Sequence, residues 1–144
     1  MADNYLEKRM EELRSGRLAV KGGIPGIKPG SRRVVVAGGC HGVARDKTLD
    51  FRNIGCRVAV FDADEKEGRK MAYANGIRFH HIDLNDRNAI EKETVALLNV
   101  WRGIDIIVGD YEKCELLRDC ICKWHDSLPI ADKPNPEMIV LNID

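Results

Sequence analysis

The chain has 144 residues, and its 23 Lys and Arg residues balance its 23 Asp and Glu residues. This length suits one domain with a single hydrophobic core, and the balanced charge does not favour binding to nucleic acid or to a membrane surface. No apolar run approaches the roughly 20 residues that span a bilayer, and the charged segment 1–12 lacks the apolar core of a secretory signal, so we expect a cytoplasmic protein.

The first 31 residues have the pattern of a helix followed by an arm. Leu6, Met10 and Leu13 recur at helical spacing between charged residues. Glycine and proline pairs crowd residues 16–31, so this stretch is predicted to be extended. We expect residues 1–31 to lie outside the domain proper, which occupies residues 32–144.

From residue 32 onward, strand and helix patterns alternate. Short apolar runs predict five strands: Val34–Gly38, Arg57–Asp62, Arg78–Ile82, Ile104–Val108 and Met138–Ile143. Amphipathic segments between them predict four helices: Val43–Ile54, Glu65–Asn75, Asp86–Arg102 and Glu112–Leu128. This alternation with short turns predicts an α/β fold, a Rossmann-like, doubly wound parallel sheet with right-handed crossovers.

The first predicted strand runs directly into a glycine-rich turn. The turn and the start of the next helix comprise Gly38, Gly39, Cys40, His41, Gly42 and Val43. Glycines let the backbone approach a pyrophosphate, and free N–H groups at the start of a helix attract the anion. The pattern therefore predicts a phosphate-binding turn, although glycines after a strand can also form only a tight turn.

The cysteines are expected to be reduced and without a metal. There are five of them: Cys40, Cys56, Cys114, Cys120 and Cys122. Their odd number argues against a disulfide framework. The last three, with His125, could be read as metal ligands, but on a helix they flank an apolar stripe that starts at Leu117 and act as small hydrophobic side chains. We favour this second interpretation and predict no metal site.

The glycine turn resembles that of the short-chain dehydrogenase/reductase family. The family's turn has the form T-G-x-x-x-G-x-G, and here Ala37-Gly38-x-x-x-Gly42-Val43-Ala44 keeps the spacing, with alanine in place of the threonine and of the last glycine. The likeness extends over about residues 33–143. It implies a five-stranded sheet in the order 3-2-1-4-5 and an NAD(P)-binding, oxidoreductase-like domain.

Two acidic residues extend the resemblance to the cofactor. Asp62 ends the second predicted strand about twenty residues after the turn. An acid at that place binds the adenosine ribose and repels a 2′-phosphate, so it implies NAD rather than NADP. Asp83, followed by Leu84, looks like the family's aspartate that contacts the adenine ring. Asp62 can also be read as a cap for the helix that begins near Glu65, and Asp83 as a loop residue.

Three features depart from the family pattern. After the fourth strand the family has N-N-A-G, but this chain has Gly109-Asp110-Tyr111-Glu112, whose two acids would repel a pyrophosphate. Asp46, expected in the first turn of the first helix, either occupies the amides that a phosphate would use or is ordinary charge at a helix start. The family's catalytic Ser and Tyr-x-x-x-Lys follow the fifth strand, and the sequence ends at Asp144, so we expect a truncated relative.

We predict no catalytic residue in the chain. None of the three tyrosines is followed by a lysine four residues later. His80 and His81 are expected to be strand-edge side chains rather than catalysts. The Cys40 thiol near a helix start could be reactive, but no base or orienting group accompanies it.

These observations favour a pseudoenzyme that retains weak NAD or nucleotide binding and serves in binding, sensing or assembly. Two alternatives stay open: an NAD-dependent oxidoreductase completed by another chain, and an oligomeric interaction protein with a self-blocked cofactor cleft. Because the family's later helices would be missing from one face of the sheet, we expect residues 1–31 to cover that face, in the same chain or on a partner. The prediction is a homodimer or a larger homo-oligomer.

Overall fold

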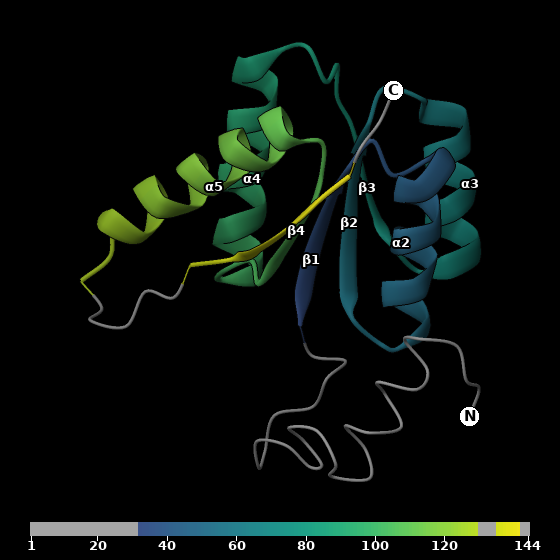
Figure 1. Cartoon of the computed structure of the whole chain (residues 1–144), viewed down its shortest axis with the longest axis horizontal. Helices are drawn as coiled ribbons and strands as arrows, with labels where there is room; N and C mark the ends of the chain where they lie inside the picture. The colour runs from purple at the N-terminus through teal and green to yellow at the C-terminus, as the bar shows by residue number, and fades with distance from the viewer. Residues whose placement is uncertain (1–31, 130–134, 142–144) are drawn as a thin grey trace, which may run out of the picture.

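A parallel sheet of five strands lies between two layers of helices in the computed structural model, which describes residues 32–129 and 135–141 (Figure 1). The strands are β1 (Arg33–Ala37), β2 (Arg57–Asp62), β3 (Arg78–His81), β4 (Ile106–Gly109) and β5 (Glu137–Val140). The helices are α2 (Gly42–Asn53), α3 (Glu65–Asn75), α4 (Arg87–Trp101) and α5 (Tyr111–Asp126). The helix and arm predicted for residues 1–31 lie outside the described residues.

The strand order β3-β2-β1-β4-β5 confirms the predicted fold. In the register, Val34 of β1 is opposite Val58 of β2 on one side and Ile106 of β4 on the other, and all pairings are parallel. Because the chain moves outward from β1 first in one direction and then in the other, the order reverses between β1 and β4. The crevice at the carboxyl ends of these two strands is where open α/β sheets bind ligands.

Helices cover both faces of the sheet at β1, which explains the apolar run in this strand. Val34 and Val36 face the layer of α2 and α3, whereas Val35 faces the layer of α4 and α5. All three valines are fully buried, as is typical of a parallel sheet covered on both sides. The apolar stripe predicted from Leu117 onward, including Ile121, packs into the second of these layers.

Among the helices of the described residues, three are directly preceded by an aspartate. Asp64, Asp86 and Asp110 precede α3, α4 and α5, and each carboxylate accepts a hydrogen bond from the N–H three residues later. Such caps satisfy N–H groups that have no partner within the helix. They also explain why the predicted and observed starts of these helices agree within one residue. No helix in the described ranges is long and apolar enough to cross a membrane.

Strand β4 begins two residues later than predicted because of a side chain. The backbone N–H of Arg33 donates to the carboxylate of Asp105, at 2.8 Å, rather than to a β4 carbonyl. The regular ladder between β1 and β4 therefore starts with Val34 opposite Ile106. Strand β5 ends at Val140, and residues 142–143 of the predicted strand lie outside the described residues.

Candidate nucleotide-binding site

The turn between β1 and α2 has the backbone that its glycines predict. Gly38 and Gly42 have φ angles of +78° and +63°, in the left-handed region that residues with a Cβ rarely adopt. The N–H of Gly38 donates to the carbonyl oxygen of Phe61 at 2.7 Å, which holds the turn against β2. The turn therefore lies at the carboxyl edge of the sheet.

Gly39 allows α2 to approach the sheet closely. A Cβ at this position would lie 2.7 Å from Thr48 Oγ1 and 3.0 Å from a methyl carbon of Val60. The hydroxyl of Thr48 is itself buried and donates to the carbonyl oxygen of Ala44 at 2.9 Å. A larger residue at position 39 would push the start of α2 away from the strands and alter the turn.

The N-terminus of α2 differs from the other three, because no side chain caps it. His41 occupies the cap position, and its side chain makes no capping hydrogen bond. No acidic residue lies in the first turn, so the expectation that Asp46 sits there is wrong. Asp46 is exposed further along the helix. The N–H groups of the first turn, with the positive end of the helix dipole, are therefore not occupied by a carboxylate of the described residues.

Asp62 lies beside the turn, as predicted, but its carboxylate is already hydrogen-bonded. Oδ2 accepts from the backbone N–H of Cys40 and Oδ1 accepts from the N–H of Asp64, both at 3.0 Å. The interpretation of Asp62 as the cap of α3 is wrong, since that cap is Asp64. The buried Asp62 carboxylate thus joins the glycine turn to the turn after β2 and places a negative charge between them.

Two side-chain contacts connect the start of α2 with the start of α3. His41 Nε2 lies 2.7 Å from Asp64 Oδ2, and Arg45 lies 3.2 Å from a carboxylate oxygen of Glu67. A hydrogen bond from the Glu67 N–H, followed by the His41 contact, holds the pKa of Asp64 below its usual value. Sequence reasoning missed both contacts, although the adjacency of β1 and β2 in the predicted sheet order would have placed the two turns side by side.

The remaining predicted site residues have different surroundings. Leu84 lies against the turn, with Cδ1 3.7 Å from the place of a Gly38 Cβ, whereas Asp83 is exposed and accepts a hydrogen bond from the N–H of Asn85. Val43 is 55% exposed at the start of α2. Burial, and then the nearby Asp62 carboxylate, raise the pKa of the Cys40 thiol to about 12, so Cys40 is not a reactive thiolate near neutral pH.

The turn after β4 carries a lysine whose position the sequence did not single out. The Asp110 carboxylate accepts from the backbone N–H of Lys113 at 2.8 Å and lies 3.9 Å from its Nζ. Glu112 lies 3.4 Å from the same ammonium, and its side chain is 88% exposed. Asp110 and Glu112 were expected to repel a phosphate, and the ammonium group of Lys113 beside them reduces this repulsion.

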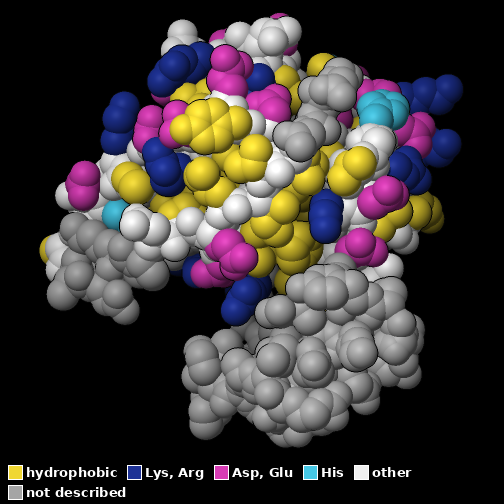
Figure 2. Space-filling view, viewed as in Figure 1, with side chains coloured by type: hydrophobic (Ala, Val, Ile, Leu, Met, Phe, Trp, Pro, Cys, Tyr) yellow, Lys and Arg dark blue, Asp and Glu magenta, His cyan; other side chains and the backbone are white. Residues whose placement is uncertain are grey.

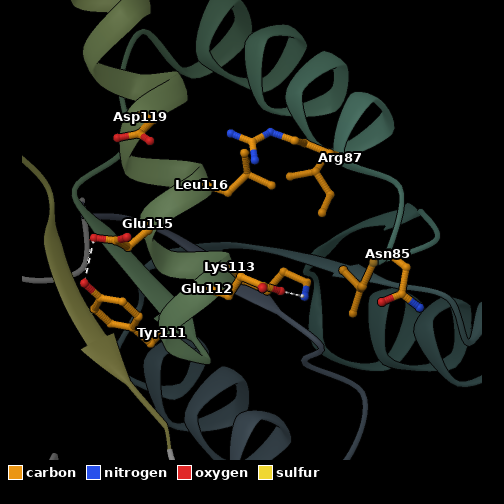
Figure 3. A pocket seen from close by; sticks show the side chains of 10 residues that line it. Asn85, Arg87, Tyr111, Glu112, Lys113, Glu115, Leu116 and Asp119 are labelled. Atoms are coloured by element: carbon orange, nitrogen blue, oxygen red, sulfur yellow. Dashed lines mark hydrogen bonds and ion pairs between the residues drawn. The ribbon is translucent and has the colours of Figure 1, made fainter.

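A cavity of about 520 Å³ opens at the same sheet edge, between α4 and α5 (Figure 3). Its lining comes from the loop after β3, from α4 and from the first half of α5. The residues are Leu84, Asn85, Arg87, Ile90, Tyr111, Glu112, Lys113, Glu115, Leu116 and Asp119. Sequence analysis did not predict this cavity, because its lining side chains come from three segments of the chain that meet only in the fold.

The histidines and cysteines have structural surroundings in the described part of the chain. His80 and His81 lie in β3, an edge strand of the sheet, as expected. The His80 side chain is only 9% exposed, and its Nδ1 lies 2.8 Å from Glu93 on α4. His81 is half-exposed, 4.0 Å from Glu65. Cys114 and Cys120 are buried in the layer of α4 and α5. Among the described residues, no group of three or more His, Cys, Asp or Glu side chains is arranged to hold a metal ion.

The sheet order and the glycine turn define a Rossmann-like α/β domain, and comparison with solved structures supports this class. One similar structure is a citronellol catabolism dehydrogenase from Pseudomonas aeruginosa PAO1, and another is a short chain dehydrogenase from Bacillus anthracis. Both have a TM-score of 0.52 and 18% sequence identity, over 55% and 56% of this chain respectively. At this identity the likeness establishes the fold alone.

The chain covers 35% of the length of each of these two structures. No protein-family model matches the sequence, and no curated protein does either.

Proposed function

We propose that this chain binds an adenine dinucleotide, NAD in preference to NADP, at the turn formed by residues 38–42. The observation that carries the proposal is the start of α2, which has no side-chain cap and follows two glycines in left-handed conformations. Backbone N–H groups and the helix dipole at such a place favour a phosphate group. Its location at the carboxyl edge of the sheet, beside the β1–β4 crevice, agrees with the general position of ligands in open α/β sheets.

The preference for NAD rests on Asp62. Its carboxylate is buried next to the turn and held there by two backbone N–H groups. A fixed negative charge at this place opposes the 2′-phosphate of NADP by like-charge repulsion. Asp64 and Glu67 add further negative charge nearby, although Arg45 partly balances it through its ion pair with Glu67.

The proposed role is binding, sensing or assembly rather than hydride transfer by this chain. The two similar solved structures are described as dehydrogenases. Within the 144 residues, however, no tyrosine is followed by a lysine four residues later. Such a pair would combine a proton donor with a cation that lowers its pKa. A hydride-transfer assay with NADH and carbonyl substrates should therefore show no turnover by the isolated chain, and measurable turnover would refute this part of the proposal.

A substitution at the start of α2 tests the binding site directly. Val43→Asp adds a carboxylate in the first turn, where it favours the helix but repels a phosphate. Val43→Thr, of similar size and uncharged, is the matched control. Titration calorimetry should show that NAD binds at least tenfold more weakly to Val43→Asp and within about threefold of wild type to Val43→Thr.

Thermal melting provides a second measurement of the same proposal. A ligand that binds only the folded state raises the Tm by mass action, so NAD should raise the Tm of the wild type more than NADP does. If millimolar NAD leaves the Tm of the wild-type chain unchanged, the proposal is wrong.

We also propose that the chain forms a homo-oligomer in which residues 1–31 contribute to the contact. Strand β5 is at an edge of the sheet, and its Val140 is 44% exposed. Apolar side chains gather on the face of the molecule seen in Figure 2. Exposed apolar patches favour association. Light scattering on the full chain and on a variant without residues 1–31 tests this proposal: a monomeric full chain, or an equally stable and equally oligomeric truncated chain, would contradict it.

A further inference from the structure

Lys113 is unusual because its side chain is only 14% exposed. Lysine is almost never buried unless it is paired. The nearest carboxylate oxygens among the described residues lie 3.4 Å away on Glu112 and 3.9 Å away on Asp110. A strong charge-assisted hydrogen bond is about 2.7–2.9 Å long. The contact with Glu112 is a long hydrogen bond, so the ammonium group keeps the capacity to donate to a closer acceptor.

Packing brings the start of the Lys113 side chain to the same sheet edge as the glycine turn. The place of a Cβ on Gly109 lies 3.2 Å from the Cβ of Ala37 and 3.7 Å from the Cβ of Lys113. Lys113 also lines the cavity together with Leu84, which lies against Gly38. In Figure 3, the Lys113 side chain extends across the cavity towards Asn85. The first turn of α5 thus faces the crevice from the side opposite α2.

The carboxylates nearest Lys113, on Asp110 and Glu112, are paired with its ammonium group. Glu115 accepts hydrogen bonds from Tyr111, at 2.8 Å, and from Arg118, at 3.2 Å. Glu112 is mostly in solvent. Asp119 is six residues further along α5, which corresponds to about 9 Å along a helix axis. An anionic group at the Lys113 end would therefore meet the ammonium and the Asn85 amide, and it would replace the long contacts of that ammonium with Glu112 and Asp110.

We infer that Lys113 binds the diphosphate of the nucleotide from the α5 side, opposite the N–H groups at the start of α2. This inference rests on the proposed function and adds a ligand class to it, namely adenine nucleotides with at least two phosphates. Lys113 also offsets the charge of Asp110, which would otherwise repel the diphosphate. A nucleoside, which has no phosphate, gains nothing from this lysine.

The test compares ADP with adenosine by titration calorimetry on the full chain. Lys113→Met keeps the length and apolar stem of the side chain but removes its charge, whereas Lys113→Arg keeps the charge. Lys92→Met is the matched control, because Lys92 is exposed on α4 and does not line the cavity. Thermal melting of each variant without ligand checks that it is folded.

We expect Lys113→Met to weaken ADP binding at least tenfold and adenosine binding less than twofold. Lys113→Arg should stay within about threefold of wild type for both ligands, and Lys92→Met within twofold. Equal losses for ADP and adenosine, or equal effects of Lys113→Met and Lys92→Met, would overturn the role of Lys113 while leaving the nucleotide site in place. A wild-type chain that binds neither ADP nor NAD would overturn the proposed function and this inference together.

Discussion

The backbone N–H of Cys40 donates a hydrogen bond to the carboxylate of Asp62, 3.0 Å away and 22 residues further along the chain. The second oxygen of the same carboxylate accepts from the N–H of Asp64, also at 3.0 Å. One buried side chain therefore sets the position of the turn after β1 relative to the turn after β2. The candidate nucleotide site depends on this link, because the start of α2 follows directly from the first of these turns.

Replacement of Asp62 should destabilise the fold as well as weaken nucleotide binding. Asp62→Ala leaves the buried N–H of Cys40 and the N–H of Asp64 without an acceptor, which should lower the free energy of unfolding by about 2 kcal/mol. Asp83→Ala is the control, since Asp83 is exposed and its loss should change stability by about 0.5 kcal/mol at most. Urea denaturation measures both variants, and equal stability of the two would contradict the structural role of Asp62.

Two glycines of the turn should respond differently to alanine. Gly39→Ala places a Cβ within 3.0 Å of Thr48, Val36 and Val60, so we expect it to lower the free energy of unfolding by about 2–3 kcal/mol. The Cβ of Gly42→Ala would have no atom within 4 Å, so only the φ of +63° is unfavourable, and we expect the free energy of unfolding to fall by about 1 kcal/mol. Chemical denaturation with both variants checks the order. A larger loss of stability for Gly42→Ala than for Gly39→Ala would show that the close packing of α2 does not limit the size of the side chain at position 39.

The pair of Arg33 and Asp105 should give the stability a dependence on acidic pH. Burial by itself would raise the pKa of Asp105, but hydrogen bonds from the side chain and the backbone N–H of Arg33 outweigh it, so the pKa lies below its ordinary value. A carboxylate with a lowered folded-state pKa contributes stability above its unfolded pKa of about 4. That contribution is lost as the pH falls through the folded-state pKa.

We therefore expect Asp105→Asn to be less stable than the wild type by about 1 kcal/mol at pH 7, a value reduced by solvent screening of these partly exposed groups. The difference should shrink as the pH falls below 4. Thermal melting between pH 2 and pH 7 measures it, with Glu65→Gln, which removes an exposed pair with Arg69, as the control. A difference that is the same at every pH would exclude the ion pair as its cause.

Only one cysteine should react readily with a thiol reagent in the native protein. Burial raises the pKa of Cys56, Cys114 and Cys120 to about 11, and burial together with Asp62 raises that of Cys40 to about 12. Cys122 is the one cysteine that is not buried. Because the thiolate is the reacting form, iodoacetamide at pH 7.5 should label Cys122 first. Mass spectrometry of peptides checks this order, and early labelling of Cys40 would refute the burial of the turn.

The order of strands and helices could be read from the sequence because it depends on local patterns. The apolar run ending at Asp62 and the amphipathic segment from Glu65 to Asn75 have the bounds that were predicted for β2 and α3. The helix is delimited by signals that lie next to it, the Asp64 cap at one end and Gly76, with its positive φ, at the other. The glycines of the first turn also have the left-handed backbone that their residue type allows.

Composition and hydrophobic periodicity, acting over a few neighbouring residues, were sufficient to specify a doubly wound sheet and the place of a glycine turn at its edge. The tertiary structure alone decided that Asp62 accepts from Cys40, that His80 contacts Glu93, and that Lys113 lines the cavity between α4 and α5. These contacts join residues that are apart in the sequence, or depend on how α4 and α5 pack over the sheet. A polar side chain takes whichever partner the folded backbone brings within hydrogen-bonding distance, and residue type and spacing do not specify that partner.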